Sequence, residues 1–403
     1  MHACRHVPYY RKVLSDAGIT NGNGIVRLDH FCQIPLLDKD TIRLRFGNLK
    51  SDVLDASHLH ENTSGGSTGE PARFLQDKIY SEMSNAAKTL DDIWSGYSQG
   101  ERKVILWGSE RDMLVGRETL KTRLGRLLRN EIWLNSYRMS NETLRAYVEK
   151  INSFKPVQIL AYVESIYELS KFIERENLSI YSPHAIMTSA GTLLPHMRQK
   201  IEKVFNTSVF NRYGSREVGD IACECNLHKG LHVSAPTHYL EILREDGTAA
   251  DAGEIGEIVI TLLTNYSMPL IRYRIGDMGM WAKEPCSCGR GWPVLAEVTG
   301  RVTDNFRSKD GTIIYGGYVR QLLYYRDWIR KYQIIQEDYN LISILIVASE
   351  QKQDLREYYA RELGEIAEKI KIVMGDCRVE YVFVNDIAPA QSGKFRYTIS
   401  KVA

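Results

Sequence analysis

The sequence lacks long hydrophobic runs, an excess of charge of one sign, and low-complexity segments. No uninterrupted apolar stretch approaches the roughly 20 residues that a membrane-spanning helix needs, so no membrane span is expected. Lys and Arg total 52 and Asp and Glu total 50, which leaves a net charge of +2 and gives no support to nucleic-acid binding by bulk charge. Gly and Pro make up about a tenth of the chain, which excludes the collagen-like class.

A secretion signal is also missing. The first 14 residues carry Arg5, Arg11 and Lys12, and no apolar segment follows them, so a signal peptide is not expected. The composition, 43% hydrophobic and 25% charged over 403 residues, is that of a globular protein. We therefore predict a cytoplasmic protein of two to three domains.

Cysteine is scarce, but four of the seven cysteines form two C-x-C pairs, Cys223 with Cys225 and Cys286 with Cys288. In a chain without a secretion signal, such pairs indicate a metal site more than disulfide bonds. We expect the three isolated cysteines to be inert: Cys4, Cys32 and Cys377.

The first half of the chain alternates helical and strand patterns, which predicts an α/β core. The expected helices cover 78–98, 141–152, 163–176 and 194–205, and the expected strands cover 103–108, 184–189 and 207–212. Asp38 precedes another helical pattern and is a candidate N-cap.

The pattern changes after about residue 230. Strands over 240–243 and 255–263, with turn signals at Asp246-Gly247 and Ala252-Gly253, predict an antiparallel β-region. A further α+β segment begins near 303, and we place a domain boundary near Arg301–Asp304. Its expected elements are strands over 332–337, 341–348 and 378–384 and a charged helix over 352–371.

The segment NTSGGSTGEP at residues 62–71 suits a loop that wraps phosphate. Glycines let the backbone approach a ligand and expose successive N–H groups, and hydroxyls donate further hydrogen bonds. No Lys follows the last Gly, so this is not the G-x-x-x-x-G-K-[ST] pattern. The alternative is a flexible Gly/Ser loop.

Two later segments combine a strand end with residues suited to a nucleotide. In NRYGSRE at 211–217, Tyr213 can lie against a flat base, and Glu217 can hold a hard cation. In PLIRYRIGD at 269–277, Asp277 can accept hydrogen bonds from ribose hydroxyls. The alternatives are an ordinary strand exit with a surface carboxylate and a turn-forming Gly-Asp.

Two basic residues complete the series. Arg301, in TGRVTD at 299–304, lies at the expected domain junction and can contact ribose or phosphate. Lys394, in PAQSGKFR at 389–396, follows a Ser-Gly turn and can neutralise a developing negative charge. Both could equally be surface residues beside turns.

The order of these five motifs resembles the adenylate-forming superfamily of acyl- and aryl-CoA ligases, and more closely its phenylacetate–CoA ligase and CapK-type branch. The resemblance covers nearly the whole chain. The opening Pro8–Arg11, the segment Ile34–Lys39 and the cysteine pairs are features of that branch. It implies an α/β fold, α+β overall: a large N-terminal domain with a layered core and a β-subdomain at 1–301, and a small mobile α+β domain at 302–403.

The resemblance also assigns roles to residues. The phosphate-binding loop corresponds to Ser64, Gly65, Gly66, Ser67, Thr68 and Gly69. Tyr213 corresponds to the residue stacked on adenine, with Gly214 beside it, and Asp277 corresponds to the ribose ligand. Glu217 corresponds to the Mg²⁺-associated carboxylate. Arg301 corresponds to the Arg near the hinge, where Thr303 replaces the family's usual charged residue, and Lys394 corresponds to the catalytic Lys of adenylation.

The implied activity has two half-reactions. A carboxylate attacks the α-phosphorus of Mg·ATP and releases pyrophosphate, and a thiol then displaces AMP from the acyl-adenylate. Coenzyme A is the expected thiol, and the C-terminal domain is expected to rotate between the steps. A carrier-protein ligase and an adenylate-dependent acyl transfer in polysaccharide or natural-product assembly are the alternatives. The expected partners are a small carboxylic acid, coenzyme A or a phosphopantetheinyl carrier protein, and a homodimer is an open alternative to a monomer.

In relatives, the acyl pocket is lined by segments that correspond here to Tyr162, Ser189, Ala190, Gly191 and Gly214. These small and polar residues leave space but do not define the acid.

The branch often has a Cys, then a His after Gly-Leu, then C-x-C-G. Cys225, His232, Cys286 and Cys288 match that order, so the resemblance implies a structural Zn²⁺ held by three thiolates and one imidazole. Cys223 and His228 are alternative ligands, and four reduced structural thiols are the simpler alternative.

Two other classes remain as alternatives. A non-catalytic nucleotide-binding assembly protein would have kept the fold, although the retained Lys394, Glu217 and Gly-rich loop argue against decay. A zinc-dependent hydrolase is disfavoured because such a site needs an open coordination position, and the four matched ligands fill it.

Overall fold

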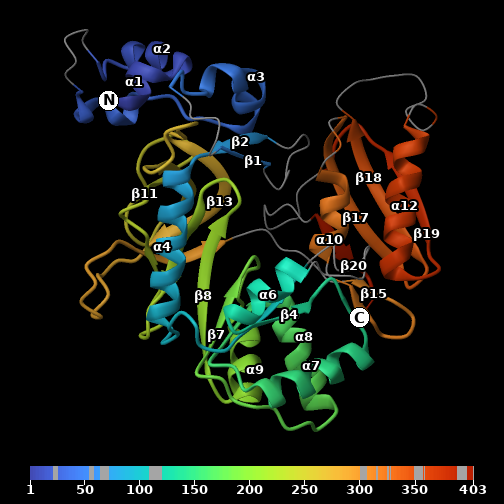
Figure 1. Cartoon of the computed structure of the whole chain (residues 1–403). Coiled ribbons are helices and arrows are strands. Elements are labelled where there is room, and N and C mark those ends of the chain that lie inside the picture. Colours follow the sequence, from blue (N-terminus) through green and yellow to red (C-terminus); the bar gives the residue numbers. More distant parts are fainter. Residues whose placement is uncertain are drawn as a thin grey trace. The chain divides into compact units, whose positions relative to one another are not determined.

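The computed structural model divides the chain into two compact units, described here separately. The described residues are 1–20, 26–53, 59–63, 72–108, 120–299, 306–314, 316–324, 326, 328–348, 357, 359–387 and 397–402. The first unit comprises the described residues within 1–64, 72–94 and 212–300, and the second comprises those within 95–211 and 301–403. Figure 1 shows the elements of both in sequence colours.

The first unit begins with short helices: α1 (His2–His6), α2 (Pro8–Asp16), the 3₁₀ helix η1 (Leu28–Gln33) and α3 (Lys39–Leu49). Asp38 caps α3, because its carboxylate accepts a hydrogen bond from the N–H of Thr41 at 2.7 Å, as expected from the sequence. The strands β1 (His60–Thr63) and β2 (Arg73–Gln76) then form a two-stranded antiparallel sheet.

The rest of the first unit is an antiparallel sheet with one long helix, α4 (Lys78–Trp94), packed on β9. β8 (Ser208–Ser215) begins in the second unit and ends in the first. From the end of β8 the strand order is β8-β9-β10-β14-β13-β12-β11. The strands are β9 (Gly219–Glu224), β10 (Leu231–Val233), β11 (His238–Leu243), β12 (Ile255–Leu262), β13 (Tyr273–Trp281) and β14 (Val294–Thr299). This confirms the expected antiparallel β-region.

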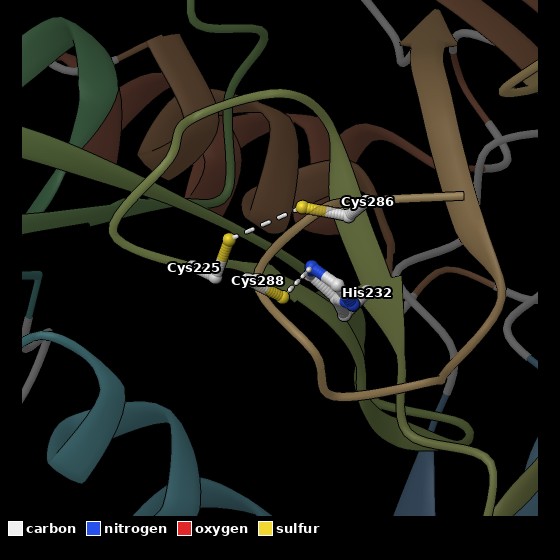
Figure 2. Close-up of side chains that lie close together, drawn as sticks. All are labelled: Cys225, His232, Cys286 and Cys288. Carbon is white, nitrogen blue, oxygen red and sulfur yellow. Dashed lines mark hydrogen bonds between the residues drawn. The ribbon is translucent and has the colours of Figure 1, made fainter. Parts of the chain in front are cut away.

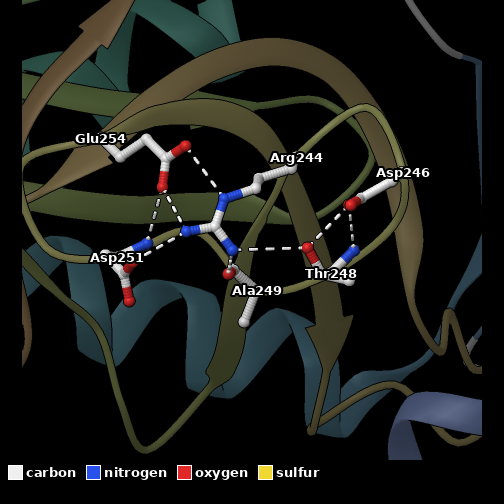
Figure 3. A network of polar contacts seen from close by, with 6 residues as sticks. All are labelled: Arg244, Asp246, Thr248, Ala249, Asp251 and Glu254. Carbon is white, nitrogen blue, oxygen red and sulfur yellow. Dashed lines mark hydrogen bonds and ion pairs between the residues drawn. The ribbon is translucent and has the colours of Figure 1, made fainter.

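The turn between β11 and β12 carries both predicted glycine turns, Gly247 and Gly253, which adopt φ angles of +83° and +88°. Figure 3 shows how Arg244 closes it. Its guanidinium makes a bidentate pair with Glu254 at 2.9 and 2.6 Å and a further contact with Asp251 at 2.8 Å. These charges are exposed, so we assign them to turn geometry rather than to much stability.

The segment before α3 is anchored on β13 by Arg272. Its backbone carbonyl accepts from the N–H of Leu37 at 2.9 Å, and its side chain donates to the carbonyls of Cys32 and Ile34. The guanidinium also pairs with Glu241 at 3.0 Å and is almost fully buried. One side chain therefore joins the N-terminal segment to the sheet.

The second unit contains a parallel sheet in the order β4-β3-β6-β7-β8. Its strands are β3 (Lys103–Trp107), β4 (Glu131–Asn135), β6 (Gln158–Tyr162) and β7 (Ala185–Ser189), and its helices are α6 (Leu120–Leu128), α7 (Asn141–Phe154), α8 (Val163–Arg175) and α9 (Pro195–Phe205). Buried aliphatic and aromatic residues of α7, α8 and α9 pack on the sheet, which explains the alternating pattern in the sequence.

The C-terminal part of the second unit has its own sheet, in the order β19-β18-β17-β20, with α12 packed against it. The elements are β17 (Ile329–Asp338), β18 (Leu341–Ala348), β19 (Arg378–Phe383), β20 (Thr398–Ser400), α10 (Gly316–Tyr324) and α12 (Ala360–Met374). A small sheet joins β5 (Arg138–Met139) to β15 (Phe306–Arg307) and β16 (Ile313–Ile314).

The mixed α/β class is thus confirmed. The helix expected over 352–371 is observed from Ala360 to Met374, and the start of its predicted range lies outside the described residues. A unit limit falls between Gly300 and Arg301, but the division into domains at 1–301 and 302–403 stays a prediction. In the part of the chain that the structure describes, no helix combines the length and the apolar character needed to cross a membrane.

Replacing Arg272 should be costly, because it would leave Glu241 as a nearly buried charge without its cation. We expect Arg272→Met to lower the free energy of unfolding by about 3–5 kcal/mol, measured by urea denaturation. Arg274→Met is the matched control, because Arg274 on β13 also pairs with a carboxylate, Glu257 on β12, but its side chain is 48% exposed. The control should cost at most about 1 kcal/mol, and equal effects in both variants would contradict the anchoring role.

Candidate functional site

Part of the site predicted from the sequence lies outside the described residues: the Gly-rich motif from Ser64 to Gly69, Arg301 and Lys394. The remaining predicted residues fall into three groups. The nucleotide residues and the cysteine cluster are in the first unit, and most of the acyl-pocket residues are in the second.

Tyr213 and Asp277, which are far apart in the sequence, meet in the first unit. The phenol of Tyr213 donates a hydrogen bond to Asp277 Oδ2 at 2.9 Å, and both side chains are half-buried. Each residue lies at a break in strand register. On β8 the break falls between Tyr213 and Gly214, and on β13 Asp277 lies opposite the break between Glu257 and Val259 of β12. Bulges of this kind redirect side chains and are frequent beside functional sites.

Gly214 lies near the end of β8, and Glu217 lies in the tight turn that joins β8 to β9. A Cβ on Gly214 would lie 2.7 Å from the carbonyl oxygen of Gly219, so only glycine fits there. Glu217 is 5% exposed, and its carboxylate lies 3.6 Å from the ammonium of Lys39. Lys39 follows the cap of α3, so the segment anchored by Arg272 also supplies the counter-charge of Glu217.

A buried charged network, not expected from the sequence, lies under this hairpin. Arg212 pairs with Asp220 at 3.5 Å, and Asp91 of α4 approaches both groups. Burial, followed by the negative charge of Asp220, raises the pKa of Asp91 to about 8, against the opposing effect of Arg212. Asp91 is therefore mostly protonated at neutral pH, and its side chain hydrogen-bonds with the thiol of Cys223.

In the second unit, residues at the carboxyl ends of parallel strands form an aromatic cluster. Tyr162 ends β6 and lies with its ring centroid 4.0 Å from that of Trp107 at the end of β3. Tyr162 is also paired in register with Ser189, the last residue of β7. The carboxyl ends of parallel strands are where ligands bind in open α/β sheets, so the predicted residues Tyr162 and Ser189 have a suitable position.

The turn after Ser189 has two unusual residues. Ala190 adopts a φ angle of +64°, which non-glycine residues rarely do. A Cβ on Gly191 would lie 2.4 Å from Glu164 Oε1, so a larger residue at this position would have to displace this carboxylate. Glu164 is buried in the first turn of α8 and was not predicted; only its position directly after the Tyr162 strand could have indicated it.

The four predicted zinc ligands come together in the first unit, as Figure 2 shows. The donor atoms of Cys225, His232, Cys286 and Cys288 all lie within 4.8 Å of one another. Sγ of Cys225 is 3.8 Å from Sγ of Cys286, and Sγ of Cys288 is 3.4 Å from Nε2 of His232. Each of the seven cysteines, all of them described, is a free thiol.

These distances suit a tetrahedral metal ion. With Zn–S near 2.3 Å and Zn–N near 2.05 Å, the edges of a tetrahedron are about 3.8 Å between sulfurs and about 3.5 Å between sulfur and nitrogen. The alternative ligands are engaged elsewhere. Cys223 contacts Asp91, and His228 Nδ1 lies 3.1 Å from Glu224 Oε2. Three thiols and one imidazole fit Zn²⁺ with no open position, which is the arrangement of a structural site.

Three comparisons with known proteins bear on this geometry. Residues 306–401 match the family model of the CapK C-terminal domain. The chain is 25% identical to protein CapK of Staphylococcus aureus over 377 residues, which cover 92% of this chain and 80% of that protein. It is 24% identical to phenylacetate–coenzyme A ligase of Thermus thermophilus over 390 residues, or 93% and 82% of the two chains.

Among solved structures, 2-hydroxyisobutyryl-CoA ligase in complex with 2-HIB-AMP and CoA superimposes with a TM-score of 0.63. The match has 19% sequence identity and covers 99% of this chain and 87% of that one, so it establishes the fold. Together these relatives confirm the resemblance predicted from the motifs.

The buried Asp91 generates a prediction about stability. Because its folded pKa lies above its unfolded value near 3.8, the folded state holds the proton more tightly, and this contribution to stability is lost as pH rises toward 8. Asp91→Asn keeps a neutral side chain at every pH. The difference in free energy of unfolding, Asp91→Asn minus wild type, should therefore increase by about 1.4 kcal/mol for each pH unit between pH 5 and 7, as measured by urea titrations. A difference that stays constant with pH would contradict a protonated Asp91.

Proposed function

We propose that this chain, which is an adenylate-forming ligase related to CapK and the phenylacetate–coenzyme A ligases, activates a small carboxylic acid with ATP and transfers the acyl group to coenzyme A. The observation that carries the proposal is the meeting of Tyr213 and Asp277 at 2.9 Å, beside the turn that holds Glu217. Tyr213 on β8 would supply the aromatic ring, Asp277 on β13 the ribose acceptor, and Glu217 in the β8–β9 turn the carboxylate for Mg²⁺. The names of the curated relatives support the choice of coenzyme A.

In the proposed first step, a carboxylate oxygen of the acid bonds to the α-phosphorus of ATP, and the bond to the β-phosphate oxygen breaks, releasing pyrophosphate. The Gly-rich loop from Ser64 to Gly69 would hold the β- and γ-phosphates, and Glu217 would hold Mg²⁺. Lys394 and Arg301 would neutralise charge around the α-phosphate. Bound Mg²⁺ would supply further neutralisation of the leaving pyrophosphate.

In the second step, the thiol sulfur bonds to the acyl carbon, AMP leaves and the thiol proton passes to solvent. Tyr162, Ser189, Ala190 and Gly191 of the second unit would border the acid. The carboxyl group of the buried Glu164 lies beside Gly191 at this border. The predicted cytoplasmic location and the homodimer stay predictions.

The function is tested with a panel of carboxylic acids in a pyrophosphate-release assay, run with coenzyme A, with a phosphopantetheinyl carrier protein and without a thiol. We expect acid-dependent release and a thioester with coenzyme A. Thioester formation with the carrier protein but not with coenzyme A would show that the acceptor is the carrier protein. Nucleotide binding without release for any acid would favour the non-catalytic alternative.

Lys394→Ala should separate the two half-reactions. Removing a preorganised charge at the reacting phosphate should lower the rate of ATP–pyrophosphate exchange by about 10²–10³. Thiolysis of a supplied acyl-adenylate should change much less, because the ammonium is needed only while the carboxylate and α-phosphate react. Near wild-type exchange would show that Lys394 is not the catalytic Lys, and equal losses in both steps would contradict alternation of the C-terminal domain.

We also propose that Cys225, His232, Cys286 and Cys288 bind one structural Zn²⁺. Their spacing supports this choice, as does the chemistry of three thiolates with one imidazole. The ion would join the turn after β9 to β10 and to the loop before β14, segments whose ligands lie about sixty residues apart in the sequence.

Purified protein should therefore contain about one zinc per chain by elemental analysis. Cys286→Ser should lose the metal and lower the melting temperature, whereas Cys32→Ser, at an exposed cysteine outside the cluster, should keep both. Wild-type protein purified without chelator and free of zinc would rule out the site.

A further inference from the structure

The loop between β13 and β14 carries two of the proposed zinc ligands, Cys286 and Cys288, and then continues into the half-buried Arg290. Gly289 and Gly291, on either side of Arg290, adopt φ angles of +79° and +70°, which favour glycine. The chain therefore turns on both sides of Arg290, and its side chain returns to the cysteine loop.

Arg290 contacts Cys288 twice. Its backbone N–H and its guanidinium both hydrogen-bond to the sulfur of Cys288. The turn of Cys225 repeats the backbone contact, because the N–H of Leu227, also two residues after its cysteine, donates to Sγ of Cys225 at 3.4 Å. The guanidinium contact is an addition to this turn geometry. It places a permanent positive charge beside a ligand sulfur, since arginine is not deprotonated in proteins.

Two other segments of the first unit hold this guanidinium. Its central carbon lies 4.7 Å from the ring centroid of Trp94, the last residue of α4, within the range of a cation–π contact. Its Nη1 lies 3.5 Å from Oδ1 of Asn226, in the turn that follows Cys225. The cysteine loop, the turn after β9 and the end of α4 therefore meet at one side chain.

Trp94 also packs on the cluster itself. Its ring centroid lies 5.6 Å from that of His232, edge to face at an interplanar angle of 76°, and 5.3 Å from that of Trp292. These rings form an apolar wall beside the four ligands. In such surroundings the attraction between a guanidinium and a thiolate is stronger than in water.

The chemistry of the ligand set gives this cation a purpose. A zinc ion carries two positive charges, whereas three thiolates carry three negative ones and the imidazole is neutral, so the loaded site would be an anion. A partly buried anion is costly without a positive partner. Arg290 supplies one positive charge at the sulfur of Cys288.

We propose that Arg290 is a positioning residue for the metal, which orients the sulfur of Cys288 and balances the charge of the loaded site while Trp94 supports its guanidinium. The inference rests on the proposed zinc site. Groups that hydrogen-bond to metal ligands from outside orient them, and their loss costs about 10–100-fold in metal affinity. An Arg290 that merely packed the loop on α4 would act through its carbon chain, and the loss of its charge would leave the affinity unchanged.

The test is competition for zinc between a chelator and the folded protein, in wild type, Arg290→Met and Arg290→Lys. Met keeps an unbranched apolar chain against Trp94 but has neither charge nor donors. We expect the Kd for zinc to rise about 10–100-fold in Arg290→Met. Arg290→Lys keeps the charge and should lie between the two. Unchanged affinity in Arg290→Met, or equal losses in the Met and Lys variants, would overturn the inference.

Replacing zinc by Co²⁺ gives a readout that does not depend on affinity. A hydrogen bond to a thiolate lowers the energy of the sulfur electrons, so its loss should move the sulfur-to-Co²⁺ charge-transfer absorption to longer wavelength in Arg290→Met. An unshifted band would show that the guanidinium does not act on a ligand sulfur, and the inference would fail.

A matched control is Arg126→Met in the second unit. Arg126 also covers a tryptophan, with its central carbon 4.6 Å from the ring centroid of Trp133, at a site apart from the four zinc candidates. This control should leave both the zinc affinity and the Co²⁺ spectrum unchanged. A loss of zinc affinity as large as that of Arg290→Met would overturn the inference.

If Arg290→Met does not fold, Trp94→Leu removes the support and leaves the guanidinium in place. It should weaken zinc binding by a smaller factor, and unchanged binding would count against the inference. Wild-type protein that binds no zinc would contradict the proposed metal site, and the inference with it. Wild-type binding together with an unaltered Arg290→Met would contradict only the role of Arg290.

Discussion

The tight turn between β8 and β9 is the constraint on which the first unit depends. It brings Gly214 so close to the carbonyl of Gly219 that a side chain cannot fit, and it directs Glu217 inward. The next carbonyl, that of Val218, accepts from Nε2 of His238 at 2.8 Å. Burial lowers the pKa of His238 to about 4, so the imidazole is neutral near pH 7 and holds the turn without adding a charge. The turn is therefore held in part by a residue that is distant from it in the sequence.

Buried charge near the turn is kept close to balance. Glu217 faces Lys39, and Arg212 lies between Asp220 and a protonated Asp91, so the described ionic groups pair one for one. Unpaired charges at these depths would cost several kcal/mol each. Binding of Mg²⁺ at Glu217, as proposed, would place a second cation beside Lys39. The ammonium must then either move or share the carboxylate, and this gives the N-terminal segment a part in the proposed nucleotide site.

The strongly periodic segments were predictable from the sequence, and so were the residues that carry chemistry in short motifs. Helix α7 and strand β18 were expected near their observed bounds because their apolar spacing is regular. The C-x-C pairs indicated a metal site, and the order of the four zinc candidates came from the family resemblance. Trp94 and Glu164 could not be found in this way, because their partners are an arginine and a glycine that only the tertiary fold brings near. A side chain that acts on a distant residue leaves no periodic or motif signal.

Strand β9 links the two parts of the first unit that the motifs identified separately. It starts at Gly219, immediately after the turn of Glu217, and its end at Glu224 precedes the first cysteine ligand, Cys225. Its Cys223 is opposite His232 on β10, so the proposed metal site and the β8–β9 hairpin share strand β9. With Zn²⁺ bound as proposed, both ends of β9 are fixed, one by hydrogen bonds to the turn and one by metal–ligand bonds. In the proposed function, this strand would contribute by keeping Glu217 in place.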